Sequence, residues 1–326
     1  MSVADVDVLM GAYRGRVPGA SVLVVDRGQP RVRLAYGLAN LERGERATPA
    51  TNYRLASVTK QFTAAAIALL VEDARLGFDD RVRDWLPSLP GAIAPVTLRQ
   101  LLTHTAGLID YEDLIASDLT RPLRDADVLA LLEREDRTYF EPGTGYRYSN
   151  GGYALLALVV ERAAGTRFAE FLRTRVFEPL GMRATVAFEA GLSTVPDRAY
   201  GYSATADGWM RTDQNATSSV LGDGGIYSSI DDLALWDAAL YDERLLRAGS
   251  LRTLFTPATP TDDPTVRYAM GWRVTGETVW HSGESIGFRN VIVRYPRRQL
   301  TVIVLTNRND PEPYRTALAI ADRYRG

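Results

Sequence analysis

The chain carries strand-like segments at both ends and helix-like segments between them, and this order constrains its fold more than any other feature. Near the start, residues 20–27 and 31–37 are rich in β-branched residues and flank Gly28-Gln29-Pro30, which predicts a hairpin. The order predicts an α/β (α+β) chain: an antiparallel sheet built from both chain ends, flanked by helices, with an inserted mainly helical subdomain. Near the end we expect four more strands and a helix, at residues 267–274, 277–281, 288–295, 300–306 and 313–324.

The middle of the chain reads as a series of helices. Apolar residues recur at helical spacing from Ser57 to about Gly77. Capping boxes at 97–100 and 229–232 predict two helix starts, and residues 153–163 and 168–177 also fit helices. A chain of 326 residues exceeds the size at which single cores usually stop growing, so we expect one catalytic unit of two subdomains. The predicted α/β sheet subdomain spans 1–82 and 220–326, and the mainly helical subdomain spans 83–219.

The composition excludes several classes of function. There is no cysteine, there are two histidines and no H-E-x-x-H-like spacing, so we expect neither a metal nor a cofactor. The formal net charge of −2 provides no basic field for nucleic acid or anionic membranes. The apolar runs are far shorter than the roughly 18 residues of a membrane span, and the N-terminal segment does not read as a signal peptide. We therefore expect a cytoplasmic protein with small-molecule partners, and leave its oligomeric state open.

Lysine usage singles out one position. Lys60 is the only lysine among 38 basic residues. Codon preference explains an excess of arginine, but it does not explain why one lysine is kept at position 60. A buried lysine can lose its proton and act as a base, which arginine cannot do.

Lys60 belongs to an S-x-x-K sequence, Ser57-Val58-Thr59-Lys60, at the start of a predicted helix. Positions i and i+3 share a helix face, so the hydroxyl and the amine can meet. The helix N-terminus also favours developing negative charge there. This is the geometry of an activated serine nucleophile, although a helix cap beside a surface lysine would give the same four letters.

Two further motifs follow in chain order, Tyr148-Ser149-Asn150 and His281-Ser282-Gly283. In an extended segment Tyr148 and Asn150 point to the same side. A phenol could thus face Ser57 while the amide binds the substrate carbonyl or holds Lys60. Gly283, which lacks a side chain, would let a substrate backbone approach its strand.

Together the three motifs resemble those of the penicillin-recognising, serine β-lactamase-like superfamily, which includes class C β-lactamases, DD-peptidases and related carboxylesterases and amidases. The resemblance runs from about residue 18 to 306 and includes TNYRLASVTK, FEPGTGYRYSNGGY, GDGGIYSS and HSGESIGFRN. It implies a β-lactamase/transpeptidase-like fold, with Ser57, Lys60 and Tyr148 catalytic and Asn150, His281, Ser282 and Gly283 binding substrate. It also implies an oxyanion hole made by the backbone N–H groups of Ser57 and Glu284.

One position departs from the β-lactamase pattern. Those enzymes carry a lysine where this chain has His281, and the lysine supplies a permanent cation for a substrate carboxylate. Histidine has an ordinary pKa of about 6.5, so we expect His281 to be mostly neutral at pH 7 and to gain charge towards pH 6. Efficient β-lactamase activity is therefore in doubt, whereas hydrolase chemistry is not.

Two other residues offer alternative sites. Ser285 lies in a G-x-S-x-G sequence, Gly283 to Gly287, that matches the nucleophile elbow of α/β-hydrolases. That fold needs a histidine after the serine and a helix next to it, but both histidines precede Ser285 and a strand is expected to follow. His104 lies in an apolar helical setting, which favours a hydrogen-bonded structural histidine.

The sequence thus predicts a serine hydrolase that forms an acyl-enzyme through Ser57, with either Lys60 or Tyr148 as the general base. An esterase or amidase acting on small substrates is the first expectation. A β-lactamase or D-alanyl-D-alanine carboxypeptidase acting on a lactam or peptide is the second. A non-catalytic penicillin-binding-like protein is the third, and loss of a motif residue would be its signature.

Overall fold

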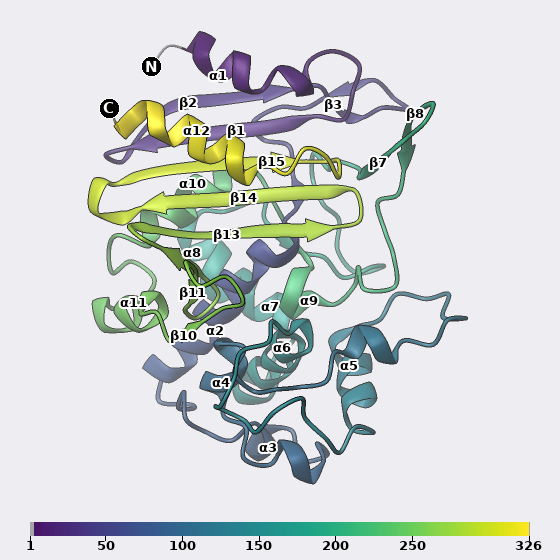
Figure 1. The fold of residues 1–326 in the computed structure, drawn as a ribbon, viewed down its shortest axis with the longest axis vertical. Helices are drawn as coiled ribbons and strands as arrows, with labels where there is room; N and C mark the ends of the chain where they lie inside the picture. Colours follow the sequence, from purple (N-terminus) through teal and green to yellow (C-terminus); the bar gives the residue numbers. More distant parts are fainter. Residues whose placement is uncertain (1–2, 326) are drawn as a thin grey trace.

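One antiparallel sheet of eight strands forms the upper part of the molecule in the computed structural model, which describes residues 3–325 (Figure 1). The strand order is β10-β11-β12-β13-β14-β15-β1-β2, so the N-terminal hairpin adjoins the last strand of the chain. Ala20 pairs with Thr306 and Asp26 with Leu300, which joins the two chain ends. The strands are β1 (Ala20–Asp26), β2 (Gln29–Tyr36), β10 (Thr259–Pro260), β11 (Arg267–Tyr268), β12 (Arg273–Thr275), β13 (Thr278–Ser285), β14 (Phe288–Tyr295) and β15 (Leu300–Thr306).

Both faces of this sheet are covered, because its central strands carry apolar side chains on both sides. On β1, Val22 and Val24 point to one face, while Leu23 and Val25 point to the other. The first face packs against α1 (Val3–Leu9) and α12 (Tyr314–Arg325), which lie side by side near the two termini (Figure 1). The second face packs against α10 (Ile230–Ala239), behind the sheet in Figure 1, and shares the main core with the helical part.

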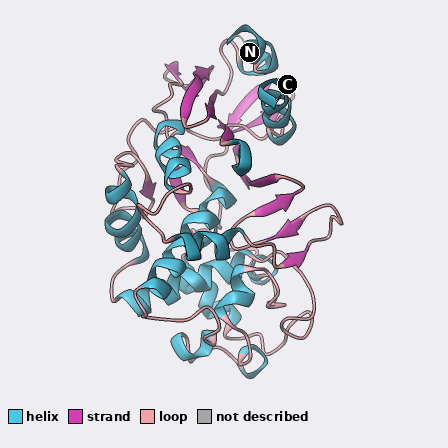
Figure 2. Cartoon of the chain, turned by 90° about the vertical axis from the view of Figure 1, so that its left-hand side faces the viewer, coloured by secondary structure: helices cyan, strands magenta, loops and turns pink. Residues whose placement is uncertain are grey.

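The helical part lies below the sheet, where Figure 2 shows most of the helices gathered. Its centre is α2 (Lys60–Glu72), which contacts α6 (Asn150–Ala164) and is buried along nearly its whole length. The remaining helices are α3 (Val82–Trp85), α4 (Leu98–Leu102), α5 (Asp125–Leu132), α7 (Phe168–Leu172), α8 (Glu178–Leu180), α9 (Leu221–Gly224) and α11 (Ala248–Phe255).

Short elements connect these parts. Six single-turn segments are η1 (Gly11–Tyr13), η2 (Ala56–Thr59), η3 (Gly91–Ile93), η4 (Tyr111–Leu114), η5 (Arg173–Phe177) and η6 (Pro296–Arg298). Small sheets in residues 3–325 are formed by β3 (Leu38–Asn40) with β4 (Glu45–Arg46) and by β7 (Tyr202–Thr205) with β8 (Gly208–Arg211). A three-stranded sheet is formed by β5 (Tyr53–Arg54), β9 (Ile226–Ser228) and β6 (Val186–Ala187), in that order.

The predicted mixed α/β architecture with a large antiparallel sheet is confirmed, and so is the capping box at Thr97. The expected strand at 267–274 is wrong in detail: it is two short strands separated at Gly271. Gly271 has a left-handed φ of +77°, and a Cβ there would lie 2.7 Å from the Lys60 carbonyl oxygen. The strand expected at 277–281 does not end at residue 281 but continues to Ser285. The helix expected at 168–177 is α-helical only to Leu172, and residues 173–177 form a π-helical turn.

No helix in the described part of the chain, residues 3–325, is long and apolar enough to cross a membrane. The cytoplasmic location stays a prediction. The division into subdomains 1–82 with 220–326 and 83–219 also stays a prediction, although the main core runs continuously from the sheet into the helices.

Candidate active site

Ser57 and Lys60 lie where the turn η2 runs into the central helix α2. Lys60 is fully buried, and its Nζ donates a hydrogen bond of 3.0 Å to Ser57 Oγ. Ala56, just before the serine, has a left-handed φ of +49°, which a residue with a Cβ rarely adopts. The turn therefore holds Ser57 in a constrained backbone at the N-terminal end of a helix.

The Lys60 amine has three hydrogen-bond acceptors. Besides Ser57 Oγ, Nζ donates to Asn150 Oδ1 at 2.8 Å and to the Asp223 carbonyl oxygen at 3.0 Å. A lysine ammonium has three N–H donors, so these three contacts use all of them.

The second motif forms the start of α6. Ser149 caps this helix by accepting from Gly152 N–H, and Asn150 is its first residue, so the segment is extended only up to Ser149. The Tyr148 ring centroid lies 4.9 Å from Lys60 Nζ. Its buried hydroxyl has no hydrogen-bond partner among the described residues.

The third motif lies on β13, but the expectation about its histidine is wrong. His281 is 1% exposed, and both ring nitrogens are used: Nδ1 lies 2.6 Å from its neighbour's carbonyl oxygen, Ser282 O, and Nε2 lies 3.0 Å from Tyr268 Oη. Burial, with the positive charges of Arg273 and Lys60, lowers the pKa of His281 well below 6.5. His281 therefore stays neutral across the range in which it was expected to gain charge.

The structure adds a second reason for glycine at position 283, while its expected role in substrate approach stays a prediction. A Cβ on Gly283 would lie 2.0 Å from the Leu55 carbonyl oxygen and 3.2 Å from Val58 N. The lack of a side chain is thus required by the chain's own nucleophile turn, which packs against β13 at this point.

The backbone of β13 leaves one edge open next to this turn. Ser285 pairs with Phe288 across a two-residue turn, so hydrogen bonds to β14 come from alternate residues, including Ser285 and Gly283. Ser282 and Glu284 direct their N–H groups to the other side. There β12 reaches only as far as Trp280. The N–H group of Glu284 therefore points to the open edge of β13, which is where a donor to an oxyanion must lie.

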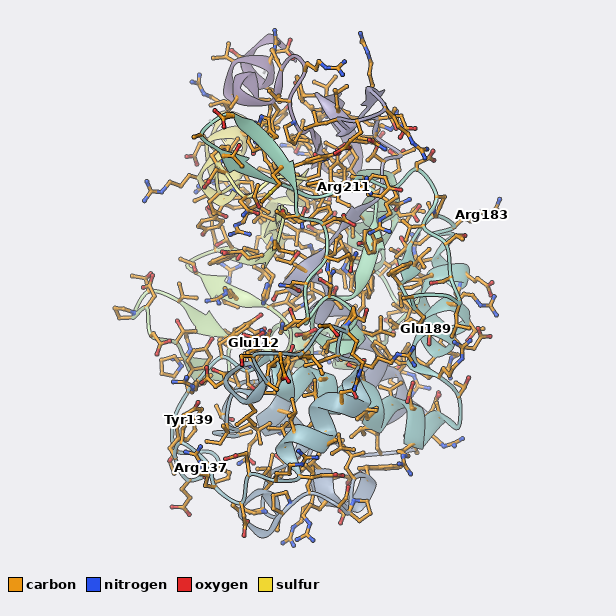
Figure 3. The ribbon with its side chains drawn as sticks, turned by 90° about the vertical axis from the view of Figure 1, so that its right-hand side faces the viewer. Glu112, Arg137, Tyr139, Arg183, Glu189 and Arg211 are labelled. Atoms are coloured by element: carbon orange, nitrogen blue, oxygen red, sulfur yellow. The ribbon has the colours of Figure 1, made fainter. Side chains whose placement is uncertain are left out.

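A cleft opens in front of Ser57. Of the predicted site residues, Ser57, Asn150 and Glu284 line it. Lys60 and His281 are buried beside it, and Tyr148 is half-buried with its hydroxyl enclosed. Arg54, Glu112 and Asp223 also line the cleft but were not predicted as site residues, although Arg54 and Asp223 lie in the resemblance segments TNYRLASVTK and GDGGIYSS. Glu112, labelled in Figure 3, lies at mid-height between the strands and the helices. The cleft is completed by Ala56, Asn215, Thr217, Gly224 and Ser285.

A missed cation also lies behind the second and third motifs. The Arg273 guanidinium on β12 lies 5.5 Å from the Tyr148 ring centroid and lowers the pKa of His281. Arg273 lies in none of the three motifs, so their spacing gave no signal for it.

The two alternative sites behave as expected. Ser285 is followed by a tight turn and by strand β14, so no nucleophile elbow forms there. His104 is 1% exposed and its Nδ1 accepts from Ser149 N–H at 3.1 Å, which confirms a structural histidine. It lies two residues after α4 rather than inside the helix. Among residues 3–325, no cluster of three or more His, Asp or Glu side chains could hold a metal ion.

Comparison with known proteins agrees with this fold. The penicillin-binding protein from Bacillus halodurans has a similar structure, with a TM-score of 0.84, 29% identity and 98% coverage of both chains. Penicillin-binding protein 4* of Bacillus subtilis is 32% identical over 319 residues, which cover 91% of this chain and 70% of that protein. D-aminopeptidase of Gluconobacter oxydans is 30% identical, over 93% of this chain but only 58% of the relative.

The fold and these relatives show that the protein is an enzyme of the serine hydrolase class. More specifically, the chain belongs to the β-lactamase family, because the model of that family matches residues 5–325. The predicted relationship to the serine β-lactamase-like superfamily is thereby confirmed.

Proposed function

We propose that the protein hydrolyses small amides and esters through an acyl-enzyme on Ser57. The observation that carries this proposal is the 3.0 Å hydrogen bond between a fully buried lysine and Ser57 Oγ at the edge of an open cleft. A buried amine beside a hydroxyl at a helix start is the arrangement of an activated nucleophile. The similarity to D-aminopeptidase, whose name denotes amide hydrolysis, supports the substrate class.

The proposed reaction has two steps. Ser57 Oγ attacks the carbonyl carbon, its proton passes to a base, and the carbonyl oxygen becomes an oxyanion that accepts from the N–H groups of Ser57 and Glu284. The C–N or C–O bond then breaks, and the leaving group takes the proton. In the second step water attacks the acyl-enzyme, gives its proton to the same base and regenerates Ser57.

The hydrogen bonds around Lys60 favour Tyr148 as this base. Lys60 Nζ donates to three acceptors, which is the bonding of an ammonium ion without a free lone pair. The Tyr148 oxygen accepts no hydrogen bond from any described residue, and its ring lies beside the Lys60 charge. In this proposal Tyr148 is the base that takes the Ser57 proton, and Lys60 holds Ser57 and Asn150 in place.

Hydrolysis of β-lactams or of D-alanyl-D-alanine peptides is the second candidate, favoured by the similarity to penicillin-binding protein 4*. A buried neutral His281 cannot supply the cation that a substrate carboxylate needs, which places this candidate second. A non-catalytic role is third, since Ser57, Lys60 and Tyr148 are all present and adjacent.

The first prediction tests the nucleophile. A fluorophosphonate probe should label Ser57, as located by mass spectrometry, and Ser57→Ala should lower kcat by a factor on the order of 10³ or more. Ser285→Ala is the matched control, because Ser285 also lines the cleft but its hydroxyl has no hydrogen-bond partner in residues 3–325. Labelling of Ser285, or a folded Ser285→Ala enzyme without activity, would reverse the assignment.

Substrate class is tested in the same preparation. A panel of p-nitrophenyl esters, D-amino-acid amides and nitrocefin should show turnover of esters and amides above turnover of nitrocefin. Faster hydrolysis of nitrocefin would move the second candidate to first place.

A further inference from the structure

Tyr148, the proposed base, is not held in place by its own polar atom. Its hydroxyl has no hydrogen-bond partner among residues 3–325, and the residue lies before the start of α6, outside any helix or strand. A base must nevertheless stay within reach of the hydroxyl whose proton it takes. The position of the phenol must therefore be set by contacts of its ring and of the backbone on either side.

One residue, His104, provides both kinds of contact. Its carbonyl oxygen accepts a hydrogen bond of 3.0 Å from Arg147 N–H, and its ring Nδ1 accepts one of 3.1 Å from Ser149 N–H. The two donors belong to the residues directly before and after Tyr148. His104 therefore binds the chain on both sides of the phenol.

The ring of His104 also packs against the phenol. Its centroid lies 4.2 Å from the Tyr148 ring centroid, 4.4 Å from that of Tyr268 and 5.2 Å from that of Tyr153. His104 is buried, and side chains in a close-packed interior have little room to move. The imidazole thus forms a fixed surface against which the Tyr148 ring packs.

The backbone of His104 is constrained as well. Its φ of +59° lies in the left-handed region, which few residues other than glycine adopt, although asparagine, aspartate and histidine do so more often than the rest. Such a conformation persists where the surrounding contacts impose it, and it points to a functional constraint. Here the constrained residue is the one whose carbonyl and ring both bind the segment of Tyr148.

The ring can accept a hydrogen bond only in its neutral form. Because Ser149 N–H donates to Nδ1, the proton of the neutral imidazole is on Nε2. Burial, followed by the charge of Lys60, lowers the pKa of His104 well below 6.5. Nδ1 therefore stays an acceptor near neutral pH.

We propose that His104 is a positioning residue, which holds Tyr148 beside Lys60 by binding the chain on both sides of it. This inference rests on the proposed function, in which Tyr148 takes the Ser57 proton. His104 does not line the cleft, so it acts through Tyr148 and not on the substrate. Its loss should therefore lower kcat and leave KM nearly unchanged.

Three replacements separate the hydrogen bond of the ring from its size and its backbone. His104→Asn keeps an acceptor, since Oδ1 of asparagine and Nδ1 of histidine are both bonded to Cγ, and asparagine tolerates the left-handed backbone. His104→Leu keeps a bulky side chain without an acceptor, and His104→Gly adopts the backbone freely without an acceptor.

The three variants are compared by steady-state kinetics on p-nitrophenyl butyrate. We expect His104→Leu and His104→Gly to lower kcat roughly tenfold or more, with KM changed less than about threefold, because small displacements of a reacting group are costly. His104→Asn should keep about a third or more of the wild-type kcat. Wild-type kcat in both His104→Leu and His104→Gly, or an equal loss in His104→Asn, would overturn the positioning role.

A double variant tests whether the effect passes through the phenol. Tyr148→Phe should lower kcat strongly by itself, because the base is removed. His104→Leu should then cause little further loss in the Tyr148→Phe enzyme, since the effects of residues that act through one group are not additive. A loss of the same factor with and without the Tyr148 hydroxyl would show that His104 acts elsewhere, and would overturn the proposal.

Thr103→Val is the matched control, because it removes a buried hydroxyl next to His104 and keeps the size of the side chain. The Thr103 hydroxyl donates to the Arg99 carbonyl at 2.8 Å and lies 3.0 Å from Thr105 Oγ1, outside the segment of Tyr148. This variant should keep the wild-type kcat. A loss as large as that in His104→Leu would reduce the effect to local destabilisation. Urea unfolding shows whether each variant is folded.

Fluorophosphonate labelling and Tyr148→Phe separate these outcomes from failure of the proposed function. An enzyme that is labelled at Ser57 and loses activity in Tyr148→Phe, but not in the His104 variants, retains the proposed function and loses the positioning role. A Tyr148→Phe enzyme with wild-type kcat loses Tyr148 as the base and the positioning role with it. A wild-type enzyme that is neither labelled nor active has lost the proposed function as a whole.

Discussion

At the scale of single residues, burial decides what His281 can do. The sequence placed a titratable group at the position of a lysine, but the ring is enclosed with both nitrogens in short contacts, to Tyr268 and to the backbone of Ser282. A positive charge on His281 would lie near Arg273 and Lys60 in a desolvated site. The position therefore organises the polar interior and contributes no charge to the cleft.

The charge state of His281 gives a prediction on substrate binding. KM for an anionic ester, p-nitrophenyl hemisuccinate, should stay nearly flat between pH 8.5 and 6.5, as should KM for the neutral p-nitrophenyl butyrate. The reason is that the lowered pKa of His281 keeps the ring neutral throughout this range. Steady-state kinetics on both esters check it. A KM that falls severalfold on acidification for the anionic ester alone would show that His281 takes up a proton after all.

The range ends at pH 6.5 because Asp223 titrates below it. The pKa of Asp223 is raised to about 6, mainly by burial. The charge of Glu112 also raises this pKa, whereas the charges of Lys60 and Arg54 lower it. Below this pH the carboxyl gains a proton and loses its charge. An anionic ligand would then bind better for a reason unrelated to His281. Asp223→Asn removes this second titration and serves as the control.

At the level of elements, β13 packs against the nucleophile turn with no room for a side chain at Gly283. Gly283 lies directly against Leu55, two residues before Ser57. The turn and the strand can therefore hold the Ser57 and Glu284 N–H groups in fixed relation only if residue 283 has no side chain.

Gly283→Ala should therefore damage both activity and stability. Its Cβ would meet a backbone oxygen at 2.0 Å, so the turn or the strand must shift. We expect kcat/KM to fall on the order of 10² or more, since small displacements of reacting groups are costly, and stability to fall by about 1–3 kcal/mol. Ester kinetics and urea unfolding measure the two effects.

Gly249→Ala is the matched glycine control. Gly249 lies in α11, and the nearest neighbouring atom to an added Cβ is 3.9 Å away. Replacement of this first-turn glycine should leave activity unchanged and change stability by less than about 1 kcal/mol. A Gly283→Ala enzyme with wild-type kinetics would show that the turn tolerates displacement.

At the scale of the whole molecule, a buried ion pair joins the sheet to the helices. Arg294 on β14 donates from Nε to Asp237 Oδ1 of α10 at 2.6 Å, and both side chains are at most 3% exposed. Thr301 on β15 donates to the same oxygen at 2.9 Å. The pair thus ties the layer of α10 to two central strands.

Removal of one partner of this pair should be strongly destabilising. Asp237→Ala leaves Arg294 buried without its carboxylate, so we expect a loss of about 3–5 kcal/mol in the free energy of unfolding. The double variant Asp237→Leu/Arg294→Met should be more stable than Asp237→Ala, because no charge remains buried. Urea unfolding measures each.

An exposed pair between the same two layers is the control. Arg33 on β2 lies 2.6 Å from Asp231 on α10, with side chains 53% and 32% exposed. Asp231→Ala should cost only about 0–1 kcal/mol. Equal costs for Asp237→Ala and Asp231→Ala would mean that burial does not set the strength of the inter-layer contact.

Features that depend on local spacing could be predicted from the residues alone. Hairpin and strand patterns at the two chain ends predicted the antiparallel sheet. The three-residue spacing of Ser57 and Lys60 predicted their contact, because a helix turn brings such residues together. The chain order of the three motifs also indicated the family to which the chain belongs.

Features that depend on distant segments became visible in the folded chain. Glu112 and Asp223 are 111 positions apart in the numbering, and only Asp223 falls in a segment of the family resemblance, GDGGIYSS, yet both line the cleft. The charge state of His281 and the requirement for glycine at 283 follow from what packs around them. Burial and close approach are properties of the folded chain, so they could not be predicted from a local pattern of residues.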